Sequence, residues 1–526
     1  MKWDYIIVGS GFGGSASALR LVEKGYRVLL LEKGQRLSGQ DFPKTNWNLK
    51  RWFWLPTLGF RGLFKMTYLR HITALSGVGV GGGSLVYAST LPQPPDEVFD
   101  SGDWRGLADW KTELRPHYAS AVRMLGAVTN PYTTPADAAL ADVARQLGRE
   151  AHMTPTRVAI HFGKPGATVA DPYFDGAGPT RTGCIQCGAC MTGCRYNAKN
   201  TLDKNYLYLA EAQGLRIDAD SEVLSLGPLD DEEGYEVQVR TGRTLWGKSP
   251  VVHRAKKVII SGGVLGTVEL LCRMQASSKG LPALSQRLGQ GVRTNSEVLI
   301  AVTSRQDHDH SKGIAIGSIL RTDEHSHIEP VRYGSGSGFF RLLGVPLAPG
   351  RHALSRLAAA VATVVRHPVN TLRWYFVHNW AKRTVILLYM RSMEGTLRLR
   401  LGRSWLTAFR KKLVSEVAEG PIPTASIPEA TEIGRRMAAR LDGYTSSMIT
   451  EVVLGSPTTA HLLGGCPMGA SIETGVIDHQ HQVFGYPGLY VIDGSSVSGN
   501  LGVNPSLTIL ALAERAMSFI GQANVK

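Results

Sequence analysis

The sequence contains little cysteine, with six residues in a chain of 526. So few cysteines exclude a disulfide scaffold of the kind that supports small secreted domains. The first apolar strand begins by Tyr5, which leaves no room for a signal peptide ahead of it. Together these absences predict a protein of a reducing compartment, and we expect it in the cytoplasm.

Acidic residues are almost absent from two stretches. Residues 43–95 hold six Lys or Arg and no acid, and residues 341–412 hold 14 against the single acid Glu394. Both stretches also carry Trp, Phe and Leu, yet neither has the run of about 18 uncharged residues that a membrane span needs. This composition suits peripheral contact with the inner face of a membrane, an acidic electron-carrier protein or the entrance for a greasy substrate. The alternative is a solvated basic face over a subunit contact.

Nucleic acid is not an expected partner, because no nucleic-acid-binding module is recognisable. The hydrophobic content of 43% and charged content of 19% describe a folded globular protein. A chain of this length predicts two or three domains.

The N-terminus has the pattern of a dinucleotide-binding turn. A strand, "DYIIV", leads into "GSGFGG", a helix to about Lys24 and a second strand, "YRVLLLE". Gly9, Gly11 and Gly14 have the spacing that permits a tight turn, close passage of a pyrophosphate and helix–strand packing. The free N–H groups of the helix then face the phosphates. Glu32 ends the second strand, where a carboxylate can hold a ribose hydroxyl.

The C-terminus is predicted to return to the same sheet. A strand at 489–492 ends in Asp493 and Gly494, and a loop then leads to a helix. Asn504 stands at the expected N-cap, with Pro505 at the first helical position. A second helix N-terminus at the cofactor is more than a nicotinamide half-domain requires and favours FAD. The alternative is that Asn504 is only a cap.

Glycine-rich segments also occur between the two ends of the chain, in "GVGVGGGSLVYAST" at 77–90 and "KKVIISGGVLGTVELL" at 256–271. We predict an α/β (α+β) fold with a Rossmann-like FAD-binding domain that is discontinuous in sequence. A second domain of mixed sheet and helices would bind substrate. The predicted FAD domain comprises 1–95, 181–300 and 456–526, and the substrate domain 96–180 and 301–455.

These segments together resemble the glucose–methanol–choline (GMC) oxidoreductases, most closely the bacterial cholesterol-oxidase-like branch. The resemblance is carried by "GSGFGG" with Glu32, "GGGSLVY", "AKNTLDKNYLYLAE", "HLLGGCPMG" and "DGSSVSGNLGVNPSLTILALAERA". It implies FAD, oxidation of a hydrophobic alcohol by hydride transfer to flavin, and His461 and Asn504 as the catalytic pair. An imidazole suits the proton that must leave the hydroxyl. Cofactor contacts are expected from Gly9, Ser10, Gly11, Gly14, Glu32, Gly82, Gly83, Ser84, Val223, Asp493, Gly494, Asn504 and Pro505.

Two departures from the family pattern stand out. Classical sterol oxidases also move a double bond with a glutamate of the substrate domain, and "YFVHNWAKRTVILLYM" offers no such residue. Tyr87 and Ala88 stand where the family often has Asn and Gly near the flavin. The first departure puts isomerase activity in doubt, and the second suggests different local contacts.

Four cysteines are concentrated in "GCIQCGACMTGC". Cys184, Cys187, Cys190 and Cys194 have the spacing of a bacterial ferredoxin, with Arg195 in place of the usual proline. We therefore expect a metal site, an iron–sulfur cluster of the 4Fe–4S type, with zinc or unligated thiols as the alternatives.

The leading hypothesis is then an FAD-dependent dehydrogenase that passes electrons through the cluster to an external acceptor. One alternative is a sterol-type oxidase that uses O2, makes hydrogen peroxide and has structural cysteines. Others are a flavin-dependent reductase or isomerase of a hydrophobic ring, and a non-catalytic flavoprotein.

Overall fold

The computed structural model describes residues 2–230, 232–242, 250–348, 350, 352–393 and 395–524. Its first sheet has the order β12-β2-β1-β15-β14-β13, and β25 also pairs with β15. β12, β2, β1, β15 and β25 are parallel, whereas β13 and β14 run antiparallel. The strands are β1 (Trp3–Val8), β2 (Val28–Leu31), β12 (Arg216–Asp218), β13 (Ser221–Pro228), β14 (Tyr235–Thr241), β15 (Val251–Ile260) and β25 (Leu489–Val491).

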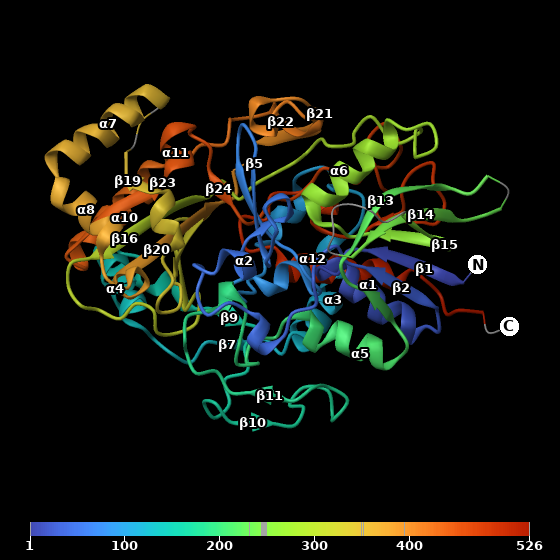
Figure 1. The fold of residues 1–526 in the computed structure, drawn as a ribbon, viewed down its shortest axis with the longest axis horizontal. Coiled ribbons are helices and arrows are strands. Elements are labelled where there is room, and N and C mark those ends of the chain that lie inside the picture. Colours follow the sequence, from blue (N-terminus) through green and yellow to red (C-terminus); the bar gives the residue numbers. More distant parts are fainter. Residues whose placement is uncertain are drawn as a thin grey trace.

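The central strands of this sheet are continuous apolar runs, as expected where helices cover a parallel sheet. All four residues of β2 are fully or almost fully buried. The helices around the sheet are α1 (Phe12–Glu23), α3 (Trp110–Met124), α5 (Tyr206–Ala212), α6 (Gly263–Gln275) and α12 (Ser506–Ser518). α12 packs against both α1 and α3, so the C-terminus is built into the N-terminal nucleotide fold (Figure 1).

A buried carboxylate fixes α12 in this position. Glu514 accepts hydrogen bonds from Arg20 of α1 at 2.7 Å and from the Tyr206 hydroxyl of α5 at 2.7 Å. Residues almost 500 positions apart thus meet in one ion pair, which confirms the predicted return of the chain to the first sheet.

The second sheet lies at the other end of the molecule and is antiparallel throughout (Figure 1). Its order is β19-β23-β16-β20-β18-β17-β8, and α4 (Pro135–Gln146) and α10 (Pro428–Arg440) pack against it in a separate core. The strands are β8 (Met153–Pro155), β16 (Val298–Ser304), β17 (Ser318–Arg321), β18 (Ser326–Val331), β19 (Gly344–Pro346), β20 (Thr384–Arg391) and β23 (Gly443–Met448).

Smaller elements complete the described chain. The helices are α2 (Leu49–Trp52), α7 (Ala353–Arg366), α8 (Pro368–Phe376), α9 (Trp380–Arg383) and α11 (Ile449–Val453). The strands are β3 (Trp54–Leu55), β4 (Phe60–Arg61), β5 (Phe64–Tyr68), β6 (Thr73–Gly77), β7 (Val128–Thr129), β9 (Arg157–Val158), β10 (Thr168–Val169), β11 (Arg181–Thr182), β21 (Thr396–Gly402), β22 (Lys412–Glu419) and β24 (Thr458–Thr459). Within the described residues, each helix is too short or too polar to cross a bilayer.

The predicted α/β fold class is confirmed by the parallel sheet with its covering helices and by the second, antiparallel sheet. The exact domain boundaries stay a prediction. α3 falls within the segment predicted for substrate binding, yet it packs on α12 and contributes Trp110 and Leu114 to the core around the first sheet.

The glycine turn offers a matched pair of substitutions. A Cβ on Gly13 would lie 1.8 Å from the Ile492 carbonyl oxygen, whereas a Cβ on Gly11 would meet no atom within 4 Å. We expect Gly13→Ala to lower the free energy of unfolding by about 1–3 kcal/mol, because the backbone must shift to admit the methyl group. Urea denaturation of the apoprotein measures this change. Gly11→Ala is the control and should unfold like the parent; equal stability of both variants would contradict this packing.

Candidate active site

The glycine turn between β1 and α1 is shaped by close backbone contacts. Gly9 has a φ of +101°, and a Cβ there would lie 2.3 Å from the Ser261 carbonyl oxygen. A Cβ on Gly82 would lie 2.6 Å from the Gly11 Cα, so the second glycine run reaches this turn. Gly11 itself borders open space, and the first turn of α1 has neither a capping side chain nor an acid. These features fit a pyrophosphate in front of the free N–H groups of α1.

Glu32 lies buried at the end of β2, as predicted. Its carboxylate accepts hydrogen bonds from the Ser10 backbone at 3.1 Å, the Ser10 hydroxyl at 2.7 Å and the Gly34 backbone at 2.8 Å. Ser10 also accepts from the Gly81 backbone at 3.1 Å, so its hydroxyl joins the two glycine segments. A carboxylate can accept about four hydrogen bonds, so a ribose hydroxyl remains chemically compatible with Glu32.

The other cofactor residues predicted from sequence lie around the same region. Ser84 is buried, donates to the Gly81 carbonyl at 2.7 Å and accepts from the Leu202 backbone at 3.1 Å, so it fixes the glycine run rather than facing open space. Val223 is buried in β13, which starts beside Glu32 because the Ser221 backbone donates to the Glu32 carbonyl at 2.8 Å. Direct cofactor contacts by Gly82, Gly83, Ser84 and Val223 stay predictions.

Asp493 connects the end of β25 to the start of α6. One carboxylate oxygen accepts from the Gly263 backbone at 2.8 Å and the Thr267 hydroxyl at 2.6 Å, and the other accepts from the Ser495 backbone at 2.7 Å. Gly494 follows, and its carbonyl accepts from the Gly464 backbone at 2.9 Å. Asp493 therefore holds the loop that leads to α12, and the cofactor contacts predicted for Asp493 and Gly494 stay predictions.

The predicted N-cap at Asn504 is wrong by one residue. α12 begins at Ser506 with Pro505 as its N-cap, and the Ile509 backbone donates to the Pro505 carbonyl at 2.9 Å. The Asn504 side chain turns away from the helix, and its Nδ2 lies 3.3 Å from the Nε2 atom of His461. Its Oδ1 is buried and has no hydrogen-bond partner in the described structure. A buried amide oxygen without a partner is costly, which suits a group that contacts a ligand.

His461 is held from its other side by a glutamate that the sequence analysis did not identify. The Glu297 carboxylate lies 2.8 Å from Nδ1 of His461 and also accepts from the Thr459 hydroxyl at 2.8 Å and the Ala460 backbone at 3.2 Å. Because a carboxylate only accepts, the Nδ1 atom carries the proton and the neutral ring presents the Nε2 lone pair to Asn504. The structure thus brings the predicted pair together and adds Glu297.

Electrostatics strengthen His461 as a proton acceptor. Burial alone disfavours the charged imidazolium, but the adjacent Glu297 carboxylate outweighs burial and raises the pKa of His461, and Glu329 adds to the same effect. A higher pKa makes the neutral imidazole a stronger base.

Glu329 is a second residue that the sequence analysis missed. It lies in β18, is fully buried, and neither carboxylate oxygen has a hydrogen-bond partner in the described residues. The Nε2 atom of His327 lies 3.7 Å from its Oε1 atom. The pairing register puts Leu299, Leu388 and Glu329 in one row across β16, β20 and β18. Glu329 therefore lies on the same face of the sheet as Leu299, which is two residues after Glu297. The motif "SHIEPV" gives a lone acid in an apolar strand, which was the available signal.

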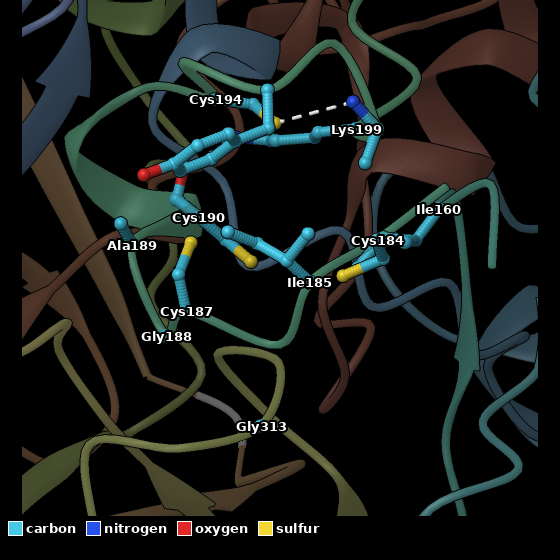
Figure 2. Close-up of a pocket in the computed structure, with 12 residues that line it drawn as sticks. Ile160, Cys184, Ile185, Cys187, Gly188, Ala189, Cys190, Cys194, Lys199 and Gly313 are labelled. Atoms are coloured by element: carbon cyan, nitrogen blue, oxygen red, sulfur yellow. Dashed lines mark hydrogen bonds between the residues drawn. The ribbon is translucent and has the colours of Figure 1, made fainter. Parts of the chain in front are cut away.

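The cysteine run does not fit the predicted metal site. All four sulfur-bearing side chains line one hollow (Figure 2), but its volume of ≈ 20 Å³ admits about one water molecule. Among the described residues, no three or more His, Cys, Asp or Glu are placed to hold a metal ion. The prediction of an iron–sulfur cluster or zinc on Cys184, Cys187, Cys190 and Cys194 is therefore not supported.

Packing explains this outcome. Cys184, Cys190 and Cys194 pack with Val158, Ile160, Ala198 and Ile314 in a small apolar cluster. Burial raises the pKa of Cys184 to about 11 and that of Cys190 to about 12, so both remain protonated thiols at neutral pH. The unligated thiols left open by the spacing are what the packing favours.

Comparison with known proteins places this geometry in context. A family model described as GMC oxidoreductase matches residues 408–513, and one described as an NAD(P)-binding Rossmann-like domain matches residues 7–75. A cholesterol oxidase of Acinetobacter baumannii is 44% identical over 527 residues, covering 98% of this chain and 94% of that protein. A cholesterol oxidase of Mycobacterium tuberculosis is 43% identical over 537 residues, covering 98% and 91%. Pyridoxine 4-oxidase from Mesorbium loti has a TM-score of 0.61 at 15% identity, covers 98% of this chain and 99% of its own, and shows likeness of fold alone.

The contact between Glu297 and His461 predicts a shift in pH dependence. Glu297→Gln removes the negative charge that raises the pKa of His461, so that pKa should fall. A proton acceptor works only when deprotonated; the acidic limb of the kcat/KM profile should therefore move to lower pH, with a lower plateau because the base is weaker. Steady-state kinetics across pH measure both effects.

Thr459→Val is the matched control, because it removes one donor to the same carboxylate but keeps the charge. Its acidic limb should stay close to that of the parent enzyme. An unchanged limb in Glu297→Gln would show that Glu297 does not govern the imidazole.

Proposed function

The chain belongs to the GMC oxidoreductase family, in its cholesterol-oxidase-like branch, and from this premise we propose that it oxidises the hydroxyl group of a sterol-like alcohol with O2 as the electron acceptor. It is an FAD-dependent oxidoreductase that acts on CH–OH groups. The proposal adds the substrate class, the acceptor and the products, a ketone and hydrogen peroxide.

The observation that carries the proposal is the row of Glu297, His461 and Asn504. An alcohol releases hydride readily only as its O–H proton leaves, and the Nε2 atom of His461 is the acceptor poised for that proton. The Asn504 amide beside Nε2 can orient the same hydroxyl. Bound FAD supplies the hydride acceptor. The charge that forms on His461 is stabilised by the buried Glu297 carboxylate.

Oxygen is favoured over an external electron carrier for two reasons. The hollow beside the four cysteines is too small for a cluster that could relay single electrons. The relatives at 43–44% identity compared above are named as oxidases. The predicted dehydrogenase with an iron–sulfur relay is therefore less well supported than an oxidase. A ring reductase or isomerase without net oxidation remains the alternative, and consumption of O2 distinguishes it.

We expect the FAD-loaded protein to consume O2 and form hydrogen peroxide in equal amounts when given a 3-hydroxysterol. His461→Ala should keep FAD and lose about 10²–10⁴-fold in turnover, because the proton acceptor is gone. An oxygen electrode, a peroxide assay and the flavin absorbance measure these quantities.

Iron and sulfide analysis of anaerobically purified protein provides an independent check of the cysteine assignment. We expect less than one iron per chain and a spectrum of flavin alone. Stoichiometric iron, together with turnover that requires an artificial electron acceptor in place of O2, would overturn the oxidase proposal. Full turnover in His461→Ala would refute the role of the imidazole.

A second activity is suggested by Glu329. A sterol ketone with an adjacent unconjugated double bond is converted to the conjugated ketone when a base removes a proton from the intervening carbon and returns it at the far end of the double bond. The resemblance to classical sterol oxidases implies a substrate-domain glutamate for this step. Glu329 is a buried carboxylate in the second sheet without a hydrogen-bond partner in the described structure, close enough to His461 to influence its pKa.

Glu329→Gln should therefore separate the two steps. We expect alcohol oxidation to persist while the unconjugated ketone accumulates, because a carboxamide cannot shuttle the proton. Chromatographic separation of the two ketones measures their ratio. Glu451→Gln is the matched control, since Glu451 is another buried glutamate but is hydrogen-bonded to Ser447 and the Thr458 backbone. Conjugated product from both variants would exclude Glu329 as the base.

A further inference from the structure

α7 presents its apolar side to solvent rather than to the core. Leu354, Leu357, Val361 and Val365 recur at helical spacing on one stripe, and Leu354 and Val365 are 81% and 73% exposed. The stripe continues through Ala358 and Ala362 as one shallow apolar surface. An amphipathic helix of a globular protein normally buries this stripe. In α7 the apolar stripe faces solvent instead.

The opposite side of α7 is fixed to the protein by a polar residue. Arg356 is buried, and its guanidinium donates to the Val452 carbonyl at 2.8 Å and the Gly350 carbonyl at 3.1 Å. Ala360 is the other buried residue of the helix. Arg356 thus holds α7 with its apolar stripe outward.

α8 extends the same surface, and the two helices together are the outer helix pair. Val369, Leu372 and Phe376 of α8 are all more than half exposed, and Phe376 is 78% exposed. The helix is anchored by Trp374, which is buried and donates to the Arg341 carbonyl at 2.8 Å. The apolar surface therefore belongs to a fixed structure at the end of the molecule opposite both termini (Figure 1).

Charge around the outer helix pair is positive. The sequence has no Asp or Glu from 342 to 393, and Arg366 and Arg373 are exposed on the pair itself. An adjoining groove of ≈ 390 Å³ is lined by residues that include Arg305, His367 and Arg435. Three acids near the groove, Asp307, Asp309 and Asp442, are paired with Arg383, Lys382 and Arg305 in that order.

We propose that the outer helix pair is a docking surface for an anionic lipid bilayer, with α7 and α8 lying in the interface and their apolar stripe among the acyl chains. The 14 residues of α7 are too few to span the hydrocarbon core, which needs about 20. An apolar stripe flanked by arginines is the pattern of helices that lie flat in the interface. Anionic headgroups account for the absence of acids along 52 consecutive positions. An acidic protein would account for it as well, but the exposed apolar stripe fits acyl chains better than the polar surface of such a protein.

The surface lies on the substrate side of the molecule. α7 packs against α11, and the chain runs from α11 through β24 directly to His461. A docked bilayer would therefore bring its apolar contents to the end of the protein that holds the second sheet. Delivery of a lipid-borne alcohol rests on the proposed function, but bilayer binding itself does not.

Sedimentation with vesicles tests the proposal. The FAD-loaded protein should bind vesicles of equimolar phosphatidylglycerol and phosphatidylcholine and bind pure phosphatidylcholine vesicles much more weakly. The double variant Leu354→Glu with Val365→Glu should lose at least tenfold in the partition coefficient, because charged groups replace the outermost apolar ones. Val169→Glu is the matched control, an exposed valine on β10 far from the pair, and should bind like the parent.

The charge contribution is tested separately. Arg366→Gln with Arg373→Gln should weaken binding to anionic vesicles by about fivefold per arginine, with little effect on neutral ones. Equal vesicle binding by the parent and the double glutamate variant would overturn the proposal. A second result would also overturn it: the parent is a dimer in analytical ultracentrifugation, the double glutamate variant is a monomer, and vesicle binding is unchanged. The apolar surface would then be the contact with a second copy of the chain. Binding is measured without substrate, so absence of alcohol oxidation would refute only the proposed function.

Discussion

The site depends on one buried contact, the pairing of Glu297 with His461. Glu297 stands at the start of β16 in the second sheet, and His461 follows β24 on the way back to the first sheet. Asn504 reaches the same imidazole from the loop ahead of α12. Three segments from different parts of the fold thus meet at one imidazole ring. The position of the second sheet relative to the nucleotide fold therefore determines the orientation and the basicity of that ring.

Two further hydrogen bonds hold the loop that carries Asn504 against segments next to the second sheet. The Asn295 amide donates to the Val503 carbonyl at 2.8 Å, and the Asn500 amide donates to the Met393 carbonyl. Each bond joins a segment next to the second sheet to the loop that carries Asn504. The loop is therefore positioned by the segments next to the second sheet as well as by α12, so a shift of either part would change the position of Asn504 relative to His461.

The sequence was most informative where function depends on neighbouring residues. The glycine turn, Glu32 and the C-terminal strand and helix could be predicted because local spacing alone defines a βα turn. Glu297 and Glu329 could not, since strand pairing between distant segments brings Glu297 into contact with His461 and Glu329 close enough to influence its pKa. The cysteine run failed for the opposite reason: its spacing was correct for a cluster, but the side chains pack into apolar surroundings. The helices α7 and α8 were not predicted, and their outward apolar stripe could not be, because helical spacing alone does not show which side of a helix is buried.

The carboxylate of Glu329 has a thermodynamic consequence. A buried acid without a hydrogen-bond partner costs free energy that an apolar side chain of similar size would not. A molecule that donates a hydrogen bond to this carboxylate offsets that cost only in the folded state. Binding of such a molecule would therefore raise the free energy of unfolding.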